Sequence, residues 1–125
     1  MTAAPLAAAN TRVRRVLIIE DEVLIAMVLE DMLDILGHVV VGTPTSLAEA
    51  ETAIAAGGFD LVIADVNLGA ESVYPLADRL RASGIGLILA TGSHRDTLPP
   101  RFADVPVLEK PYAIAAIETA FAAAA

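Results

Sequence analysis

The stretch VLIIED, residues 16–21, joins an apolar run directly to a pair of acids, and this pattern decides the fold class. Similar runs recur in LVIAD at 61–65, LILAT at 87–91 and VLEK at 107–110. Continuous apolar runs of this length are typical of strands in a sheet that is covered on both faces. Each run therefore predicts a buried strand that carries a polar or charged residue at its carboxyl end.

The segments around these runs complete an alternation of strands and helices. Ser46 with Glu49 three residues later is a capping-box signature, and Pro99-Pro100 prevents a regular helix over 93–103. Residues 67–70 are predicted to form a loop. Strands are predicted over 13–19, 38–42, 59–64, 85–90 and 105–108, and helices over 22–36, 46–56, 71–82 and 112–123.

This alternation predicts an α/β fold, a doubly wound, flavodoxin-like parallel sheet of five strands with helices on both faces. The order 2-1-3-4-5 is the common arrangement for five such strands, although the sequence alone does not prove it. In that order the first and third strands are neighbours. The carboxyl ends that carry Glu20, Asp21 and Asp65 would then meet at one point.

Helical spacing also predicts which side chains face the core. We expect Met27 to pack against the core from its helix, and His38 and His94 to be surface or loop residues. The expected inner residues are Leu24, Val28, Met32 and Ile35 in the first helix, Val73, Leu76, Ala77 and Leu80 in the third, and Ile114, Ile117 and Phe121 in the last.

Length and composition exclude several classes of protein. The 125 residues predict one domain, with a flexible tail over 1–12 and a folded domain over 13–125. The net charge of −8 argues against direct nucleic-acid binding, and the lack of cysteine excludes thiol chemistry. Despite a mean hydropathy of +0.65, no apolar run approaches the roughly 20 residues that span a bilayer. With no evident secretory signal, we expect a cytoplasmic protein.

The polar residues at the strand ends form a candidate site. Clustered carboxylates repel one another unless a proton or cation lies among them. Mg²⁺ prefers oxygen ligands and binds phosphate oxygens, so Glu20, Asp21 and Asp65 are candidate ligands, together with the backbone carbonyl of Asn67. Lys110 adds a positive charge that suits a phosphoryl group. The set predicts phosphoryl transfer onto a carboxylate, with Asp65 as the nucleophile.

Each of these residues also has a simpler interpretation. Asp65 or Asn67 alone is a common turn residue, and acids such as Glu20 and Asp21 are favoured at the start of a helix. A threonine at a strand end, as at Thr91, is common, and a single lysine is usually a solvated surface residue. The functional interpretation depends on all of them meeting at one edge of the sheet.

Taken in order, Glu20-Asp21, Asp65, Thr91 and Lys110-Pro111 resemble the receiver domain of two-component response regulators over about residues 14–123. The resemblance implies that Asp65 accepts a phosphoryl group from a histidine kinase or phosphotransfer protein. It implies that the three acids hold Mg²⁺ and that Thr91 and Lys110 contact the phosphate. The only implied activities are self-phosphotransfer and autodephosphorylation, and a downstream protein partner is expected.

One position departs from the common pattern of this family. Many receivers carry an aromatic residue three positions before the lysine, whereas this chain has Val107. Its stretch LATG, residues 89–92, is similar to a receiver subgroup that has Phe-Ala-Thr-Gly and no aromatic switch. We therefore expect the segment 93–103, with few apolar anchors other than Leu98 and Phe102, to respond to phosphorylation.

Three other classes are weaker candidates. A haloacid-dehalogenase-type phosphatase needs a second aspartate two residues after the nucleophile, where this chain has Asn67. A flavodoxin-like nucleotide binder needs a Gly/Ser/Thr-rich loop after the first strand, where this chain has acids. A degenerate receiver that serves only as a docking module is the main alternative. It is disfavoured because Asp65, Thr91 and Lys110 are all present.

Overall fold

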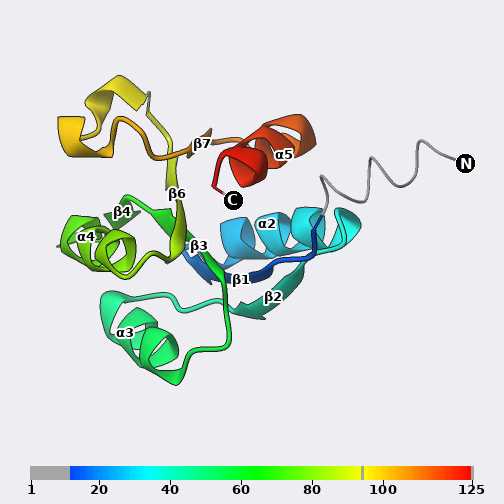
Figure 1. Ribbon diagram of the computed structural model, residues 1–125, viewed down its shortest axis with the longest axis horizontal. Helices are drawn as coiled ribbons and strands as arrows, with labels where there is room; N and C mark the ends of the chain where they lie inside the picture. Colours follow the sequence, from blue (N-terminus) through cyan, green and yellow to red (C-terminus); the bar gives the residue numbers. More distant parts are fainter. Residues whose placement is uncertain (1–11, 94, 125) are drawn as a thin grey trace, which may run out of the picture.

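The computed structural model describes residues 12–93 and 95–124, and within them a parallel sheet of five strands lies between two layers of helices (Figure 1). The expected tail, apart from Arg12, and His94 lie outside the described residues. In spatial order the strands are β2 (Val39–Gly42), β1 (Arg15–Ile19), β3 (Leu61–Asp65), β6 (Gly86–Thr91) and β7 (Val107–Glu109). The predicted doubly wound fold with strand order 2-1-3-4-5 is therefore confirmed.

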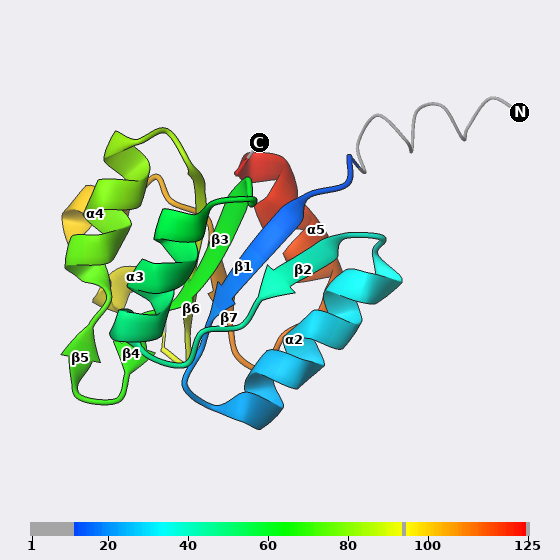
Figure 2. The same ribbon diagram turned by 90° about the horizontal axis from the view of Figure 1, so that it is seen from below.

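The helices cover both faces of the sheet, as Figure 2 shows. The helices α3 (Leu47–Ala56) and α4 (Tyr74–Ala82) pack on one face, where the core contains alternate residues of the central strands such as Leu17 and Val62. The helices α2 (Val23–Ile35) and α5 (Ile114–Ala123) pack on the other face, against Ile18 and Ile63. Both faces of the strands are thus buried, which accounts for their continuous apolar runs. No helix in the described part of the chain is both long and apolar enough to cross a bilayer.

The orientation of α2 differs from the prediction. Its buried residues are Ala26, Leu29 and Leu33, with Met32 packed beside them. By contrast, Leu24 is 77% exposed and Ile35 is 75% exposed. Val28 and Met27 are exposed too, so of the residues expected to face the core only Met32 does so. The helix is apolar on most of its circumference, and helical spacing alone therefore did not identify the buried side.

The loop and helix predicted over 67–82 are also revised. Residues 67–72 form a short antiparallel hairpin of β4 (Asn67–Leu68) and β5 (Glu71–Ser72), and Gly69 has φ +60° in its turn. Consequently α4 begins at Tyr74 rather than at Glu71. The predicted inner residues of this helix region are correct, because Val73, Leu76, Ala77 and Leu80 are all buried.

Two local predictions are refined by the side-chain contacts. The Ser46 hydroxyl accepts a hydrogen bond from the Glu49 amide, as a capping box requires, but the Glu49 carboxylate accepts from Thr45 instead of reaching Ser46. His38 lies in the loop between α2 and β2, in agreement with the prediction of a surface or loop residue, and is half-buried. Its Nδ1 accepts the Arg14 amide at 3.1 Å and its ring lies 4.6 Å from that of Phe121.

The segment 93–103 is irregular, as predicted, but is better anchored than the sequence suggested. It contains two short 3₁₀ turns, η1 (Arg95–Thr97) and η2 (Pro100–Phe102). Phe102 is fully buried and stacks on Tyr74 at 5.3 Å between ring centres. Arg81 of α4 donates to the Arg101 carbonyl and to both carboxylate oxygens of Asp104. These contacts fix the second half of the segment to α4.

Candidate functional site

Three carboxylates meet at the carboxyl edge of the sheet. Glu20 and Asp21 follow β1, and Asp65 is the last residue of β3, the strand beside it. One oxygen from each of the three carboxyl groups lies within 4.8 Å of the others. Glu20 is 2% exposed and Asp65 is 3% exposed, whereas Asp21 faces solvent. Pairing β1 with β3 thus brings together acids that lie more than forty residues apart in the chain.

Lys110 is the cation of this cluster and follows β7. Its Nζ lies 2.7 Å from Oδ2 of Asp65 and 3.0 Å from Oε1 of Glu20. Burial lowers the pKa of the Lys110 ammonium, but its hydrogen bond to Asp65 and its close contact with the Glu20 carboxylate outweigh this effect and raise the pKa above its ordinary value of 10.5. The lysine therefore remains charged at neutral pH and bridges two of the three acids. The Lys110-Pro111 peptide bond, left open by the sequence, is cis.

One positive charge does not fully compensate the buried acids. Burial, and then the neighbouring Asp65 carboxyl, raise the pKa of Glu20 from 4.5 to about 7, against the opposite effect of Lys110. Among the described residues, Oε1 of Glu20 receives no hydrogen bond, although it lies within ion-pair distance of the ammonium. A buried acceptor of this kind is costly without a partner. A metal cation placed among the acids would provide a partner for this oxygen.

Backbone amides hold the second carboxylate oxygen of Asp65 and of Glu20. Oδ1 of Asp65 accepts the amide of Asn67 at 2.9 Å, and Oε2 of Glu20 accepts the amide of Glu22 at 3.1 Å. These bonds fix the orientation of both side chains. The sequence suggested the backbone carbonyl of Asn67 as a metal ligand. In the structure, the backbone amide of Asn67 also contacts Asp65. No sequence pattern indicated either of these amide contacts.

Thr91 ends β6 next to Asp65 and is 1% exposed. Its Oγ1 accepts the amide of Ser93 at 3.0 Å, and its carbonyl accepts the amide of Lys110 at 2.9 Å. The threonine therefore links the cation of the site to the start of the segment 93–103. Its hydroxyl hydrogen is free to turn toward another acceptor while Oγ1 accepts from Ser93.

The described residues fit a hard divalent cation. Glu20, Asp21 and Asp65 supply three carboxylates, which is the donor chemistry that Mg²⁺ prefers, and the exposed Asp21 leaves one side open to water or phosphate oxygens. Gly69 of the β4–β5 hairpin also borders this group. A Cβ at that position would lie 3.9 Å from Oδ2 of Asp21. The hairpin turn therefore belongs to the surroundings of the site, which no sequence pattern indicated.

All five side chains selected from the sequence for the site lie at this edge of the sheet. The response regulator receiver domain family matches residues 16–121, and the chain belongs to this family. A match to that family over most of the chain disfavours the phosphatase and nucleotide-binder classes. Among curated proteins, none matches the chain significantly.

Solved structures of receivers are similar over nearly the whole chain. SdrG from Sphingomonas melonis Fr1 is 44% identical with a TM-score of 0.80, over 89% of this chain and 95% of SdrG. SdrG from Pseudomonas melonis Fr1 in a BeF3-activated conformation is 44% identical with a TM-score of 0.77, over 87% and 93%. The response regulator PhyR from Brucella abortus is 28% identical with a TM-score of 0.76, over 96% of this chain but only 52% of PhyR.

Proposed function

We propose that this receiver accepts a phosphoryl group on Asp65 from the phosphohistidine of a histidine kinase or phosphotransfer protein, in a Mg²⁺-dependent reaction. The observation that carries the proposal is the position of the Lys110 ammonium, 2.7 Å from Asp65 within a group of three carboxylates. A purely structural ion pair needs one acid for one lysine. Three acids around one lysine suit a site that takes up a further cation and an anionic group.

The chemistry follows from this geometry. A carboxylate oxygen of Asp65 forms a bond to phosphorus while the P–N bond to the donor imidazole breaks, and the electron pair of that bond stays on the imidazole nitrogen. Lys110 neutralises charge on the phosphoryl oxygens, and the Thr91 hydroxyl donates a hydrogen bond to one of them. Glu20, Asp21 and Asp65 would hold Mg²⁺, which when bound neutralises phosphoryl charge.

The similarity to SdrG supports the proposal, because a receiver that is 44% identical has been solved in a BeF3-activated conformation. PhyR adds less, since the chain spans about half of it. We propose that the chain acts by self-phosphotransfer and autodephosphorylation, without turnover of another substrate. The proposal includes a cytoplasmic location and a downstream protein partner that responds to the phosphorylated form.

Intact-mass measurement tests the proposal. Acetyl phosphate with Mg²⁺ should add one phosphoryl group to the wild-type chain, and Asp65→Asn should abolish the addition. Asp78→Asn, an aspartate of α4 whose partner is Arg101, is the matched control and should be labelled like the wild type. Labelling of the Asp65→Asn variant would refute Asp65 as the acceptor. A folded wild-type chain that is never labelled, by acetyl phosphate or by a phosphohistidine donor, would favour a docking module instead.

A further inference from the structure

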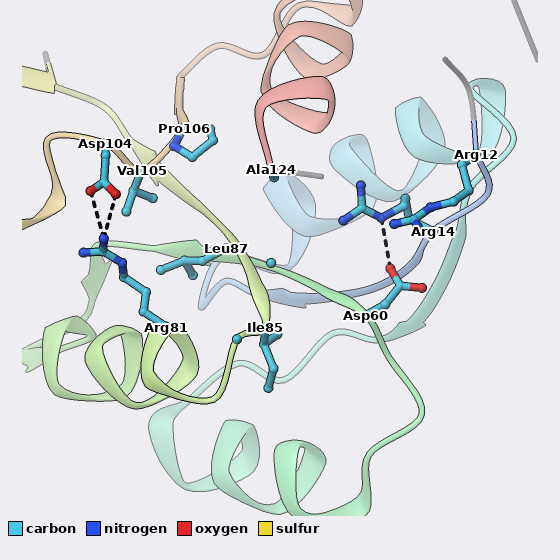
Figure 3. Close-up of a pocket in the computed structure, with 12 residues that line it drawn as sticks. Arg12, Arg14, Asp60, Arg81, Ile85, Leu87, Asp104, Val105, Pro106 and Ala124 are labelled. Carbon is cyan, nitrogen blue, oxygen red and sulfur yellow. Dashed lines mark hydrogen bonds and ion pairs between the residues drawn. The ribbon is translucent and has the colours of Figure 1, made fainter. Parts of the chain in front are cut away.

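A cavity of about 390 Å³ lies at the edge of the sheet opposite the acid cluster. Figure 3 shows the residues that line this cavity. The cavity is bordered by the residues before β1 and β3, the stretch from the end of α4 to the start of β6, the residues before β7 and the end of α5. Cavities of this volume accommodate small organic ligands. Arginines line it at both ends, although the chain as a whole carries a net charge of −8.

Arg14 lies at one end of this cavity and is only 5% exposed. Its Nε donates to Oδ1 of Asp60 at 3.1 Å. Within residues 12–93 and 95–124, its two terminal nitrogens donate to no protein acceptor, but they are not fully buried, so they are open to the cavity. A guanidinium has five donor hydrogens, and those on the terminal nitrogens are available to a ligand that displaces water. Those donors border the cavity.

The remaining charges leave the cavity cationic. Arg81 is already paired with Asp104, and the second oxygen of Asp60 accepts the amide of Arg15 at 3.2 Å. Arg12 lies beside Arg14 and has no carboxylate partner in the part of the chain that the structure describes (Figure 3). Three arginines therefore line the cavity together with two aspartates. The excess positive charge is at the end formed by Arg12 and Arg14.

The backbone and the apolar lining give the cavity its form. A Cβ on Gly86 would lie 3.2 Å from Nη2 of Arg14, so the absence of a side chain allows the guanidinium to lie against β6. Between the two arginine ends, the side chains of Ile85, Leu87 and Val105 provide an apolar lining (Figure 3). A ligand that fits both parts has an anionic group and an apolar body.

We propose that this cavity binds a small organic anion, with its phosphate or carboxylate group held by Arg12 and Arg14 and its apolar body against Leu87 and Val105. Guanidinium groups match both kinds of oxyanion through paired hydrogen bonds. The site is separate from the acid cluster, since β6 carries Gly86 at one end and Thr91 at the other. Binding therefore does not require Asp65 or Mg²⁺, and the proposal stands apart from the proposed phosphorylation.

Amide chemical shifts of the full chain, recorded without Mg²⁺ during titration with phenyl phosphate, test this proposal. We expect saturable shifts at Gly84, Gly86 and Leu87, and the same response in Asp65→Asn. Arg12→Gln should weaken binding about tenfold, which corresponds to the loss of one charge-assisted hydrogen bond. Arg79→Gln, an equal change of charge at an exposed position of α4, should leave the affinity unchanged.

Three further probes identify the group that is recognised. If benzoate and phenyl phosphate both bind, the site recognises oxyanions in general. If phenyl phosphate and inorganic phosphate bind but benzoate does not, the site recognises phosphate. Benzyl alcohol, which has the apolar body without the charge, should not bind. Equal binding of benzyl alcohol, an unchanged affinity in Arg12→Gln, or no saturable shift with either phenyl phosphate or benzoate would overturn the proposal.

Discussion

The two edges of the sheet differ in how their charges are paired, although β1 and β3 contribute charged residues to both edges. β1 lies between Arg14 and Glu20, and β3 follows Asp60 and ends at Asp65. At the amino edge the neighbouring charges are opposite, and Arg14 pairs with Asp60 at 3.1 Å. At the carboxyl edge both are carboxylates. Since parallel neighbours bring equivalent strand ends together, the sign of the terminal residues decides whether an edge is closed by an ion pair or needs an added cation.

This difference predicts opposite effects on stability when one carboxylate is removed from each edge. At the amino edge the carboxylate compensates a buried cation. At the carboxyl edge the negative charge of Glu20 is not fully compensated, as its raised pKa indicates.

Asp60→Ala should lower the free energy of unfolding by about 2 kcal/mol, because it leaves the guanidinium of Arg14 buried without its carboxylate. Urea denaturation at pH 7 measures this change. Asp78→Ala removes an aspartate from an exposed pair with Arg101 and should cost less than about 0.5 kcal/mol. Equal losses in both variants would show that the Arg14–Asp60 pair does not stabilise the amino edge.

Glu20→Gln should stabilise the metal-free protein by about 1 kcal/mol at pH 8. Between pH 4.5 and about 7 the folded wild type retains a proton on Glu20 that the unfolded chain has lost. The folded state thus binds more protons, and the free energy of unfolding should fall as pH rises through this window. Denaturation with urea at several pH values, compared between the wild type and Glu20→Gln, measures this term.

Glu118→Gln, an exposed glutamate of α5, is the control for the loss of one negative charge. Its stability should follow the pH profile of the wild type. If Glu20→Gln shows the same profile as this control, the carboxyl edge carries no excess charge that destabilises the fold.

Mg²⁺ should raise the melting temperature of the wild type by a few degrees, because a ligand that binds only the folded state stabilises it. Asp21→Ala should lose most of this rise, since Asp21 is the most exposed of the three acids and contributes little to packing. Thermal melts with Mg²⁺ or a chelator measure the response. Asp31→Ala, an exposed acid of α2, should keep it. An equal Mg²⁺ response in Asp21→Ala would exclude Asp21 as a ligand.

The smallest expected effect concerns the spread of a signal from the carboxyl edge. Amide hydrogen exchange with and without beryllium fluoride, an anion similar in size to a phosphoryl group, should change at residues 92–97, which follow Thr91. Residues 98–104 should change less, because Phe102 is buried and Arg81 holds Asp104. The amino edge near Gly86 should not respond. A uniform change over all three regions would contradict independent behaviour of the two edges.

The sequence alone was sufficient for the fold class and for the residues at the carboxyl edge. Buried parallel strands appear as continuous apolar runs, and polar residues directly after such runs must lie at the sheet's end. Asp65 and Lys110 were therefore recognisable without coordinates. The strand order was expected from its frequency in folds of this kind, and the pairing of β1 with β3 confirmed it.

Features that depend on competition between partners were established by the folded chain. The helix α2 is apolar around most of its surface, and contact with the sheet selected Leu29 and Leu33 over Leu24. The raised pKa of Glu20 arises from burial and from Asp65, which is distant in sequence. The cavity beside Arg14 likewise depends on five segments that meet only in the folded chain. Local patterns fix where a strand ends, whereas packing fixes which charges face one another and which remain uncompensated.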